Sequence, residues 1–534
     1  MRHRTRILNA VAALSVALLI AALVSRKSAV SVELHTDKTG LRSITVDDVD
    51  ILRFGGFNVD DVQLLGKDGV LRAASGAGRN SFQPTGQTAT YEYPWGTINV
   101  QYVASNSQLT LRIATTNKSP SDTIQSVRYT PLSLKFPQAI NEYDGSTPLL
   151  EHNIDRIGYA AVTFGNYLII VSSDDVDKPL MVGFPWALDG PSNTEFPLSV
   201  HTGRVKNFPD SLPAINRPIP PGQTDTFTIS LRFGRKGDDP TAAVADLNER
   251  FLRAFPAELK WTDHRPIGAI FLATPPRNVI NNPRGWFGDQ NFSILTAPAG
   301  FRQRLLEVAE GAIRIMREMD AQGAITWDLE GQQFFAEAGY AADPRALEQL
   351  APEMAAVADD YFKKFTDAGL LTGISVRPQQ LSLSDDRKTL KQVPVEDPTE
   401  LLAAKIRYAR NRWGIRLVMI VANANASDPN PIGASVIQAL AHQFPDVLLI
   451  PEHSSLRYHA YSAPYQELRR GRTGTPPAAA AIYPNAFSVI YTADGALDSY
   501  RNELRKSVQR GDIAMYRTWF QDPQNQKVRM LHGQ

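Results

Sequence analysis

The stretch Gly323-Ala-Ile-Thr-Trp-Asp-Leu-Glu-Gly331 combines a short apolar run with two carboxylates that lie two residues apart. An apolar run of this length, bounded by glycines, is typical of a buried strand. Side chains at positions i and i+2 of a strand point to the same side, so Asp328 and Glu330 are expected to project together where the strand ends. The stretch therefore predicts a pair of acids at the carboxyl end of a buried strand.

After Pro266 one order of elements recurs, an apolar strand, a polar loop and an amphipathic helix. The helix with the clearest periodicity runs from Asp343, its N-cap, to Ala368. No Gly-rich phosphate loop follows any predicted strand, which disfavours a nucleotide-binding sheet. The alternation predicts a (β/α) barrel of eight strands with one short or irregular. Seven segments read as its parallel strands: 267–272, 324–327, 373–377, 416–421, 447–450, 487–491 and 512–516.

The segment from Val30 to about Gly234 has short alternating runs separated by Gly, Pro, Asn, Asp and Ser. Many short strands with turn residues between them predict a β-sandwich. Asp239 and Pro240 then begin a helix that extends to about Arg253. The predicted organisation is an N-terminal segment (1–29), a β-sandwich domain (30–238), a helix and connector (239–265) and a barrel domain (266–534).

A basic flank at residues 2–6 precedes the run Leu8 to Val24, roughly 17 uncharged residues, which is the lower limit for a spanning helix. The positive-inside rule leaves the flank in the cytoplasm and sends the rest of the chain across the membrane. The segment is either an inner-membrane anchor or a signal peptide cut near Ser28. We expect an exported protein, anchored and facing the periplasm, or periplasmic or secreted if the segment is cleaved.

Composition excludes several classes of function. Lysine and arginine number 56 against 55 acidic residues in 534, so the net charge of +1 gives no indication of a nucleic-acid partner. The chain has no cysteine, which excludes thiol nucleophiles, disulfides, iron–sulfur clusters and cysteine-ligated zinc. No cofactor is predicted.

Polar side chains follow most of the predicted barrel strands, and the active site of such a barrel lies at those ends. We predict three catalytic carboxylates: Glu330 and Glu452 as the working pair, and Asp328, which orients Glu330 or raises its pKa. Arg377 is expected to hold a carboxylate or an acidic sugar. Glycoside hydrolysis requires paired carboxyl groups, with amides and aromatic rings around the sugar. The predicted substrate-binding residues are Trp327, Arg377, Asn423, His453, Tyr458, Asp494 and Trp519.

Each candidate also has a structural interpretation. The Asp328–Glu330 pair could cap the next helix or pair with Arg377, and an aspartate before a glycine, such as Asp494, is typical of a turn. The acids and histidines could instead bind a divalent metal ion around Asp328, His453 and Asp494. No i, i+4 histidine pair supports that alternative.

The chain resembles bacterial glycoside-hydrolase-like proteins in which a β-sandwich, in some of them galactose-mutarotase-like, precedes a (β/α) barrel. The layout from Val30 to Gln534 and the motifs Trp327-Asp328-Leu329-Glu330-Gly331 and Pro451-Glu452-His453 carry the resemblance. It implies hydrolysis of O-glycosyl bonds in an envelope or secreted polysaccharide. The Asp-x-Glu pair is also similar to that of chitinases. In that family acidic residues precede the pair, whereas residues 322–326 of this chain are Gln-Gly-Ala-Ile-Thr.

The fourth predicted strand departs from the pattern of many retaining barrel glycosidases. Those enzymes carry an acid at the end of this strand, whereas this chain has Val421-Ala-Asn-Ala-Asn425. Either the acids come from the second and fifth strands, or the barrel binds polysaccharide within an export or assembly system without hydrolysing it. Both alternatives stay open at this point, and the sequence identifies no protein partner.

Overall fold

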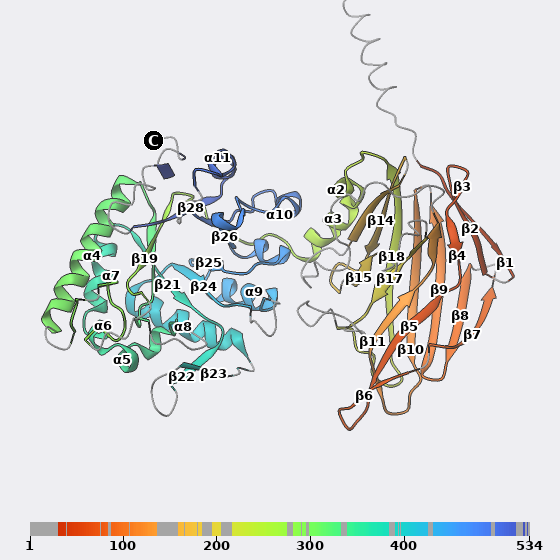
Figure 1. Ribbon diagram of the computed structural model, residues 1–534, viewed down its shortest axis with the longest axis horizontal. Coiled ribbons are helices and arrows are strands. Elements are labelled where there is room, and N and C mark those ends of the chain that lie inside the picture. Colours follow the sequence, from red (N-terminus) through yellow and green to blue (C-terminus); the bar gives the residue numbers. More distant parts are fainter. Residues whose placement is uncertain are drawn as a thin grey trace, which may run out of the picture. The chain divides into compact units, whose positions relative to one another are not determined.

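The computed structural model describes residues 30–531 with gaps at 39, 75, 84–86, 106, 136–158, 165, 179, 184–194, 204–215, 275–280, 290, 295–297, 333–338, 384–389, 394, 396, 425–430, 493–496, 519–526 and 529–530. The predicted N-terminal segment 1–29, Asp494 and Trp519 lie outside the described residues. No helix among the described residues is long and apolar enough to cross a membrane. The chain divides into two compact units, residues 1–251 and 252–534 (Figure 1).

The first unit consists of antiparallel sheets (Figure 1). The seven-stranded sheet has the order β13 (Tyr159–Phe164), β14 (Tyr167–Ser173), β18 (Thr224–Arg235), β10 (Gln108–Asn117), β9 (Gly96–Ser105), β8 (Thr88–Tyr93) and β7 (Arg79–Gln83). The five-stranded sheet has the order β15 (Met181–Gly183), β17 (Ser199–His201), β11 (Thr123–Thr130), β5 (Asn58–Leu65) and β6 (Leu71–Ala73). Two three-stranded sheets join β1 (Val32–Asp37), β2 (Gly40–Val46) and β3 (Val49–Asp50), and β16 (Glu195–Pro197), β12 (Ser133–Lys135) and β4 (Leu52–Phe54).

The two large sheets share one hydrophobic core. The Tyr129 hydroxyl on β11 lies 2.9 Å from Thr115 Oγ1 on β10, and its ring centroid lies 5.5 Å from that of Phe227 on β18. Leu109 and Leu111 are fully buried, in agreement with the alternating pattern along β10. These contacts confirm the predicted sandwich. A helical segment follows it in two pieces, α2 (Pro240–Ala243) and α3 (Ala245–Ala254).

The second unit contains a parallel eight-stranded sheet. Its order is β25 (Leu448–Pro451), β24 (Leu417–Ile420), β21 (Leu371–Val376), β20 (Gly323–Trp327), β19 (Ile267–Phe271), β28 (Ile513–Arg517), β27 (Val489–Tyr491) and β26 (Tyr465–Glu467). The Ala463 N–H donates to the Leu449 carbonyl over 3.0 Å, which links the chain just before β26 to β25. The sheet is therefore a nearly closed (β/α) barrel, which confirms the predicted fold.

The helices around the barrel include α4 (Pro298–Glu318), α8 (Pro398–Trp413), α9 (Ala434–Gln443), α10 (Pro477–Ile482) and α11 (Arg501–Gln509). Short 3₁₀ turns lie at η3 (Leu456–Ala460) and η4 (Leu468–Arg470), and a hairpin of β22 (Gln380–Leu383) and β23 (Leu390–Val393) follows β21.

The single helix predicted from Asp343 to Ala368 is wrong in its continuity. Asp343 does cap a helical turn, and its side chain accepts from the Arg345 N–H. The segment is then divided into η2 (Pro344–Ala346), α5 (Leu347–Leu350), α6 (Pro352–Ala355) and α7 (Ala358–Asp367). Pro352 supplies no N–H and disfavours helical dihedrals at the residue before it, and Ala351 accordingly has φ −143° and ψ 70°.

Candidate active site

A pocket of about 260 Å³ lies at the carboxyl ends of the barrel strands. Its lining combines an aromatic wall with apolar residues from inside the barrel and four charged side chains. The aromatic residues are Phe271, Trp327, Tyr340, Tyr465 and Tyr491; the apolar ones are Met419, Val421 and Met515; the charged ones are Glu452, Glu467, Arg469 and Arg517. The composition suits a ligand with both apolar faces and hydroxyl groups.

The aromatic wall is held by contacts among its own members. The rings of Phe271 and Trp327 stack with centroids 5.1 Å apart and an interplanar angle of 25°, and Tyr491 lies 6.3 Å from Phe271 at its edge. The Trp327 indole N–H donates to the Tyr340 hydroxyl, and burial raises the pKa of Tyr340. Burial also raises the pKa of Tyr465. Both phenols therefore stay neutral and present hydroxyl groups to the pocket.

Glu452 follows β25 and is held by the backbone of the neighbouring strand. Its Oε2 accepts a 2.6 Å hydrogen bond from the Ala422 N–H, and its own N–H donates to the Ile420 carbonyl over 2.9 Å. Ala422 has a φ of 50°, which is unusual for a residue with a Cβ and costs free energy. This conformation directs the Ala422 N–H, which lies just after β24, toward the Glu452 carboxyl group.

Glu467 ends β26 and lies between two arginines. Arg470 Nε lies 2.8 Å from Glu467 Oε2, and Arg469 Nε contacts Oε1. Elsewhere in the lining, Arg517 Nε donates to the Tyr491 hydroxyl over 3.1 Å, and the Arg517 guanidinium lies 5.5 Å from the Phe271 ring centroid. The pocket is therefore lined by carboxylates from the ends of β25 and β26 and by guanidinium groups.

The two acids of the stretch 323–331, Asp328 and Glu330, are buried and are not among the described residues that line the pocket. Strand β20 ends at Trp327, and Asp328 has a φ of 54°, so the alternation of a strand does not continue to Glu330. Burial raises the pKa of each carboxyl to about 7, and the Glu330 charge adds to the effect at Asp328.

Glu330 belongs to an ion cluster of three buried residues, Glu330, Asp343 and Lys405, and the exposed Arg345, which we call the buried ion cluster. Glu330 Oε1 accepts from the Asp343 N–H over 2.8 Å, and Asp343 Oδ2 lies 2.8 Å from Arg345 Nη2 and 3.6 Å from Lys405 Nζ. Lys405 is fully buried, and burial lowers its pKa to about 8. The cluster ties the segment after β20 to α8.

Arg377 adjoins both the cluster and the pocket. Lys405 donates to its carbonyl oxygen over 2.8 Å, and its guanidinium lies 5.7 Å from the ring centroid of Tyr340. Its Nε and Nη1 are buried and make no hydrogen bond to any residue that the structure describes. Burial lowers the pKa of Arg377, while the negative charges of Glu330 and Glu452 act on that pKa in the opposite direction.

The remaining predicted residues differ in their placement. Trp327 and Glu452 line the pocket. Asn423 and His453 form a reciprocal pair, in which the Asn423 amide donates to the His453 carbonyl and accepts from its N–H, both over 2.8 Å. Tyr458 is buried and donates to the Ile432 carbonyl. Sequence reasoning missed Glu467 and Tyr465, because β26 has only three residues and follows no apolar run.

Asp328 and Glu330 are expected to make folding stability fall between about pH 4 and pH 7. Their ordinary pKa values are 3.8 and 4.5, and both are raised to about 7 in the folded chain. Between these values the folded state binds more protons than the unfolded state, so the free energy of unfolding decreases as pH rises. Urea unfolding from pH 5 to pH 8 measures the slope. Asp328→Asn and Glu330→Gln should each flatten it, and an unchanged slope in both variants would contradict the assignment.

Comparisons with known proteins agree with this architecture, although neither family models nor curated proteins give a match. The alpha-N-acetylgalactosaminidase NagBb from Bifidobacterium bifidum, in its GalNAc complex, is similar over 94% of this chain and 91% of its own, with 11% identity and a TM-score of 0.51. The chain shares the fold of this enzyme. The chain also matches TtGalA, an alpha-galactosidase from Thermus thermophilus, over 81% of the chain and 99% of the enzyme, with 10% identity and a TM-score of 0.40. A galactose mutarotase-like protein from Lactobacillus casei matches 38% of the chain over 97% of its own length, with 10% identity and a TM-score of 0.26.

Proposed function

We propose that the barrel hydrolyses O-glycosidic bonds in an envelope or secreted polysaccharide. The observation that carries this proposal is the presence of two carboxylates, Glu452 and Glu467, in one aromatic-lined pocket at the barrel mouth. Both usual mechanisms require one carboxyl group to protonate the leaving oxygen and a second to act as nucleophile or to activate water. The aromatic wall provides faces on which a sugar ring stacks.

We assign the working pair to Glu452 and Glu467. Glu467 lies between two guanidinium groups, which suits the anionic role of nucleophile or base. Glu452 then serves as the acid, held in place by the Ala422 N–H. Glu330 accepts a hydrogen bond from the Asp343 N–H, and its negative charge interacts with the Arg377 guanidinium. We therefore propose that Glu330 positions Arg377. The predicted pair of Glu330 and Glu452 is the competing assignment.

A second candidate function is polysaccharide binding without hydrolysis, and one observation favours it. After β24, the Asn423 side-chain amide makes one hydrogen bond to the His453 carbonyl and accepts one from the His453 N–H. No carboxylate follows β24 among the residues that the structure describes there. Under this alternative the carboxylates of the pocket hold ligand.

Product release distinguishes the two candidates. The purified full chain is incubated with a panel of bacterial exopolysaccharides and aryl glycosides, and new reducing ends are measured. Turnover supports the hydrolase. Retention of a polysaccharide without new reducing ends, in the parent and in a Glu452→Gln variant alike, supports the binding module. For location, we propose an exported protein held by the apolar segment Leu8 to Val24; fractionation of cells into membrane and soluble material tests it.

A further inference from the structure

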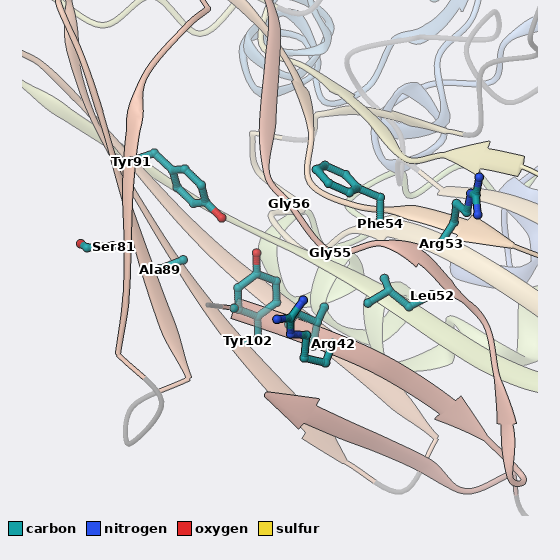
Figure 2. A pocket seen from close by; sticks show the side chains of 12 residues that line it. Arg42, Leu52, Arg53, Phe54, Gly55, Gly56, Ser81, Ala89, Tyr91 and Tyr102 are labelled. Atoms are coloured by element: carbon teal, nitrogen blue, oxygen red, sulfur yellow. The ribbon is translucent and has the colours of Figure 1, made fainter. Parts of the chain in front are cut away.

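A second pocket, of about 280 Å³, is formed entirely by the first unit (Figure 2). Its lining comes from β2, β4, β7, β8 and β9 and from the two glycines that follow β4. The residues are Gly40, Leu41, Arg42, Leu52, Arg53, Phe54, Gly55, Gly56, Ser81, Ala89, Tyr91 and Tyr102. Among these twelve described residues two are arginines and none is acidic.

The hydroxyl groups of Tyr91 and Tyr102 point into this pocket (Figure 2). Tyr91 is fixed by the Phe57 ring, 5.1 Å away, and its oxygen accepts a long hydrogen bond from the Phe57 N–H. The Tyr102 side chain is 1% exposed, and its hydroxyl hydrogen-bonds to that of Tyr91. A hydroxyl group both donates and accepts, so this pair of hydroxyls can make further hydrogen bonds to a ligand in the pocket.

Phe54 supplies an apolar face at the same pocket. Its side chain is 51% exposed, which is high for a large aromatic residue. The ring lies directly against the backbone of Gly56, where an added Cβ would be 2.3 Å from Phe54 Cζ. The ring is therefore held in place by packing on one side while its other surface stays accessible, as in sites that stack sugar rings.

Arg42 supplies positive charge to the lining of this pocket (Figure 2). Its Nε donates to Asp37 Oδ2 over 2.7 Å, which orients the guanidinium, and the side chain is half exposed. Guanidinium groups bind carboxylates through two parallel hydrogen bonds. Arg53 adds a second positive charge to the lining, so an anionic group is favoured over a cationic one.

We propose that this pocket binds a uronic acid unit, with the sugar ring against Phe54, its hydroxyl groups on Tyr91 and Tyr102, and its carboxylate on Arg42. The site is a binding site for acidic polysaccharide in the β-sandwich. It does not depend on hydrolysis by the barrel. A barrel without activity and a filled β-sandwich site are compatible results, and each is measured by a different experiment.

The test is titration of the full chain with D-galacturonate, with D-galactose and with inorganic phosphate, followed by calorimetry. We expect D-galacturonate to bind more tightly than either of the others. Tyr102→Phe and Arg42→Gln should each weaken D-galacturonate binding about 10-fold, the effect of one lost hydrogen bond to a charged or buried group. Tyr102→Phe removes only the hydroxyl, so the fold should persist, and unfolding curves check it.

Arg72→Gln is the matched control, because it removes the same charge from β6, outside the pocket. Its D-galacturonate affinity should equal that of the parent. The proposal is overturned if D-galacturonate does not bind, or if its affinity is unchanged in Tyr102→Phe and Arg42→Gln. Equal affinity for D-galactose overturns the role of Arg42, and equal affinity for phosphate overturns recognition of a sugar.

Discussion

Replacing Glu452 with glutamine is expected to lower kcat by about 10²- to 10⁴-fold, the usual contribution of a positioned acid or base. Glutamine keeps the shape of the side chain and its oxygen still accepts from the Ala422 N–H, so the pocket is preserved while the proton is lost. Initial rates on the best substrate of the panel, measured with unfolding midpoints of both proteins, provide the measurement. A variant with full activity would exclude Glu452 from the chemistry.

Two further variants, Glu467→Gln and Glu330→Gln, test which carboxylate works with Glu452 in catalysis. If the pocket pair is correct, Glu467→Gln loses activity on the scale of Glu452→Gln. Glu330→Gln should then change activity much less, since Glu330 Oε1 is occupied by the Asp343 N–H and the side chain does not line the pocket. The opposite order, with Glu330→Gln inactive and Glu467→Gln active, would establish the pair predicted from the sequence.

Replacing Lys405 with methionine is expected to destabilise the chain by about 3–5 kcal/mol, the usual cost of removing one partner from a buried ion pair. Lys405 Nζ donates to the carbonyls of Arg377 and Gln379 over 2.8 and 3.0 Å and lies 3.6 Å from Asp343 Oδ2. Methionine fills the space but leaves these buried acceptors without their donor. The free energy of unfolding in urea measures the loss.

Lys363→Met is the control for this prediction. Lys363 lies on the exposed side of α7 and pairs with Asp367 four residues later, over 2.6 Å. Exposed pairs of this kind contribute at most about 1 kcal/mol. Equal stability losses in the two variants would show that the buried ion cluster has no special importance for the fold.

The barrel could be predicted because its strands are continuous apolar runs and its helices are amphipathic. The one missed strand, β26, has the sequence Tyr-Gln-Glu, in which no periodicity can be detected. It pairs with β27, where Tyr465 lies in register with Val489 and the Val489 N–H donates to the Pro464 carbonyl over 3.1 Å, and a local sequence pattern does not contain these tertiary contacts. Glu467 was missed for this reason.

The placement of Asp328 and Glu330 depends on one backbone angle, the φ of Asp328. A strand that continued past Trp327 would carry Asp328 and Glu330 on one side, but the positive φ of Asp328 ends the alternation. Aspartate is among the residues that tolerate this conformation, and nothing else in the sequence distinguishes a turn from a strand end here. The presence of acids near the barrel mouth was predictable, whereas their access to the pocket was not.

The closure of the barrel also bears on the width of the pocket. Glu452 follows β25 and Glu467 ends β26, and these are the first and last strands in the sheet order. The backbone of β25 is joined to the chain just before β26 by the hydrogen bond from the Ala463 N–H to the Leu449 carbonyl. Opening between segments held by few hydrogen bonds costs less free energy than opening within a full ladder. We therefore expect the distance between these two carboxylates to change more readily than the spacing of strands joined by a full hydrogen-bond ladder.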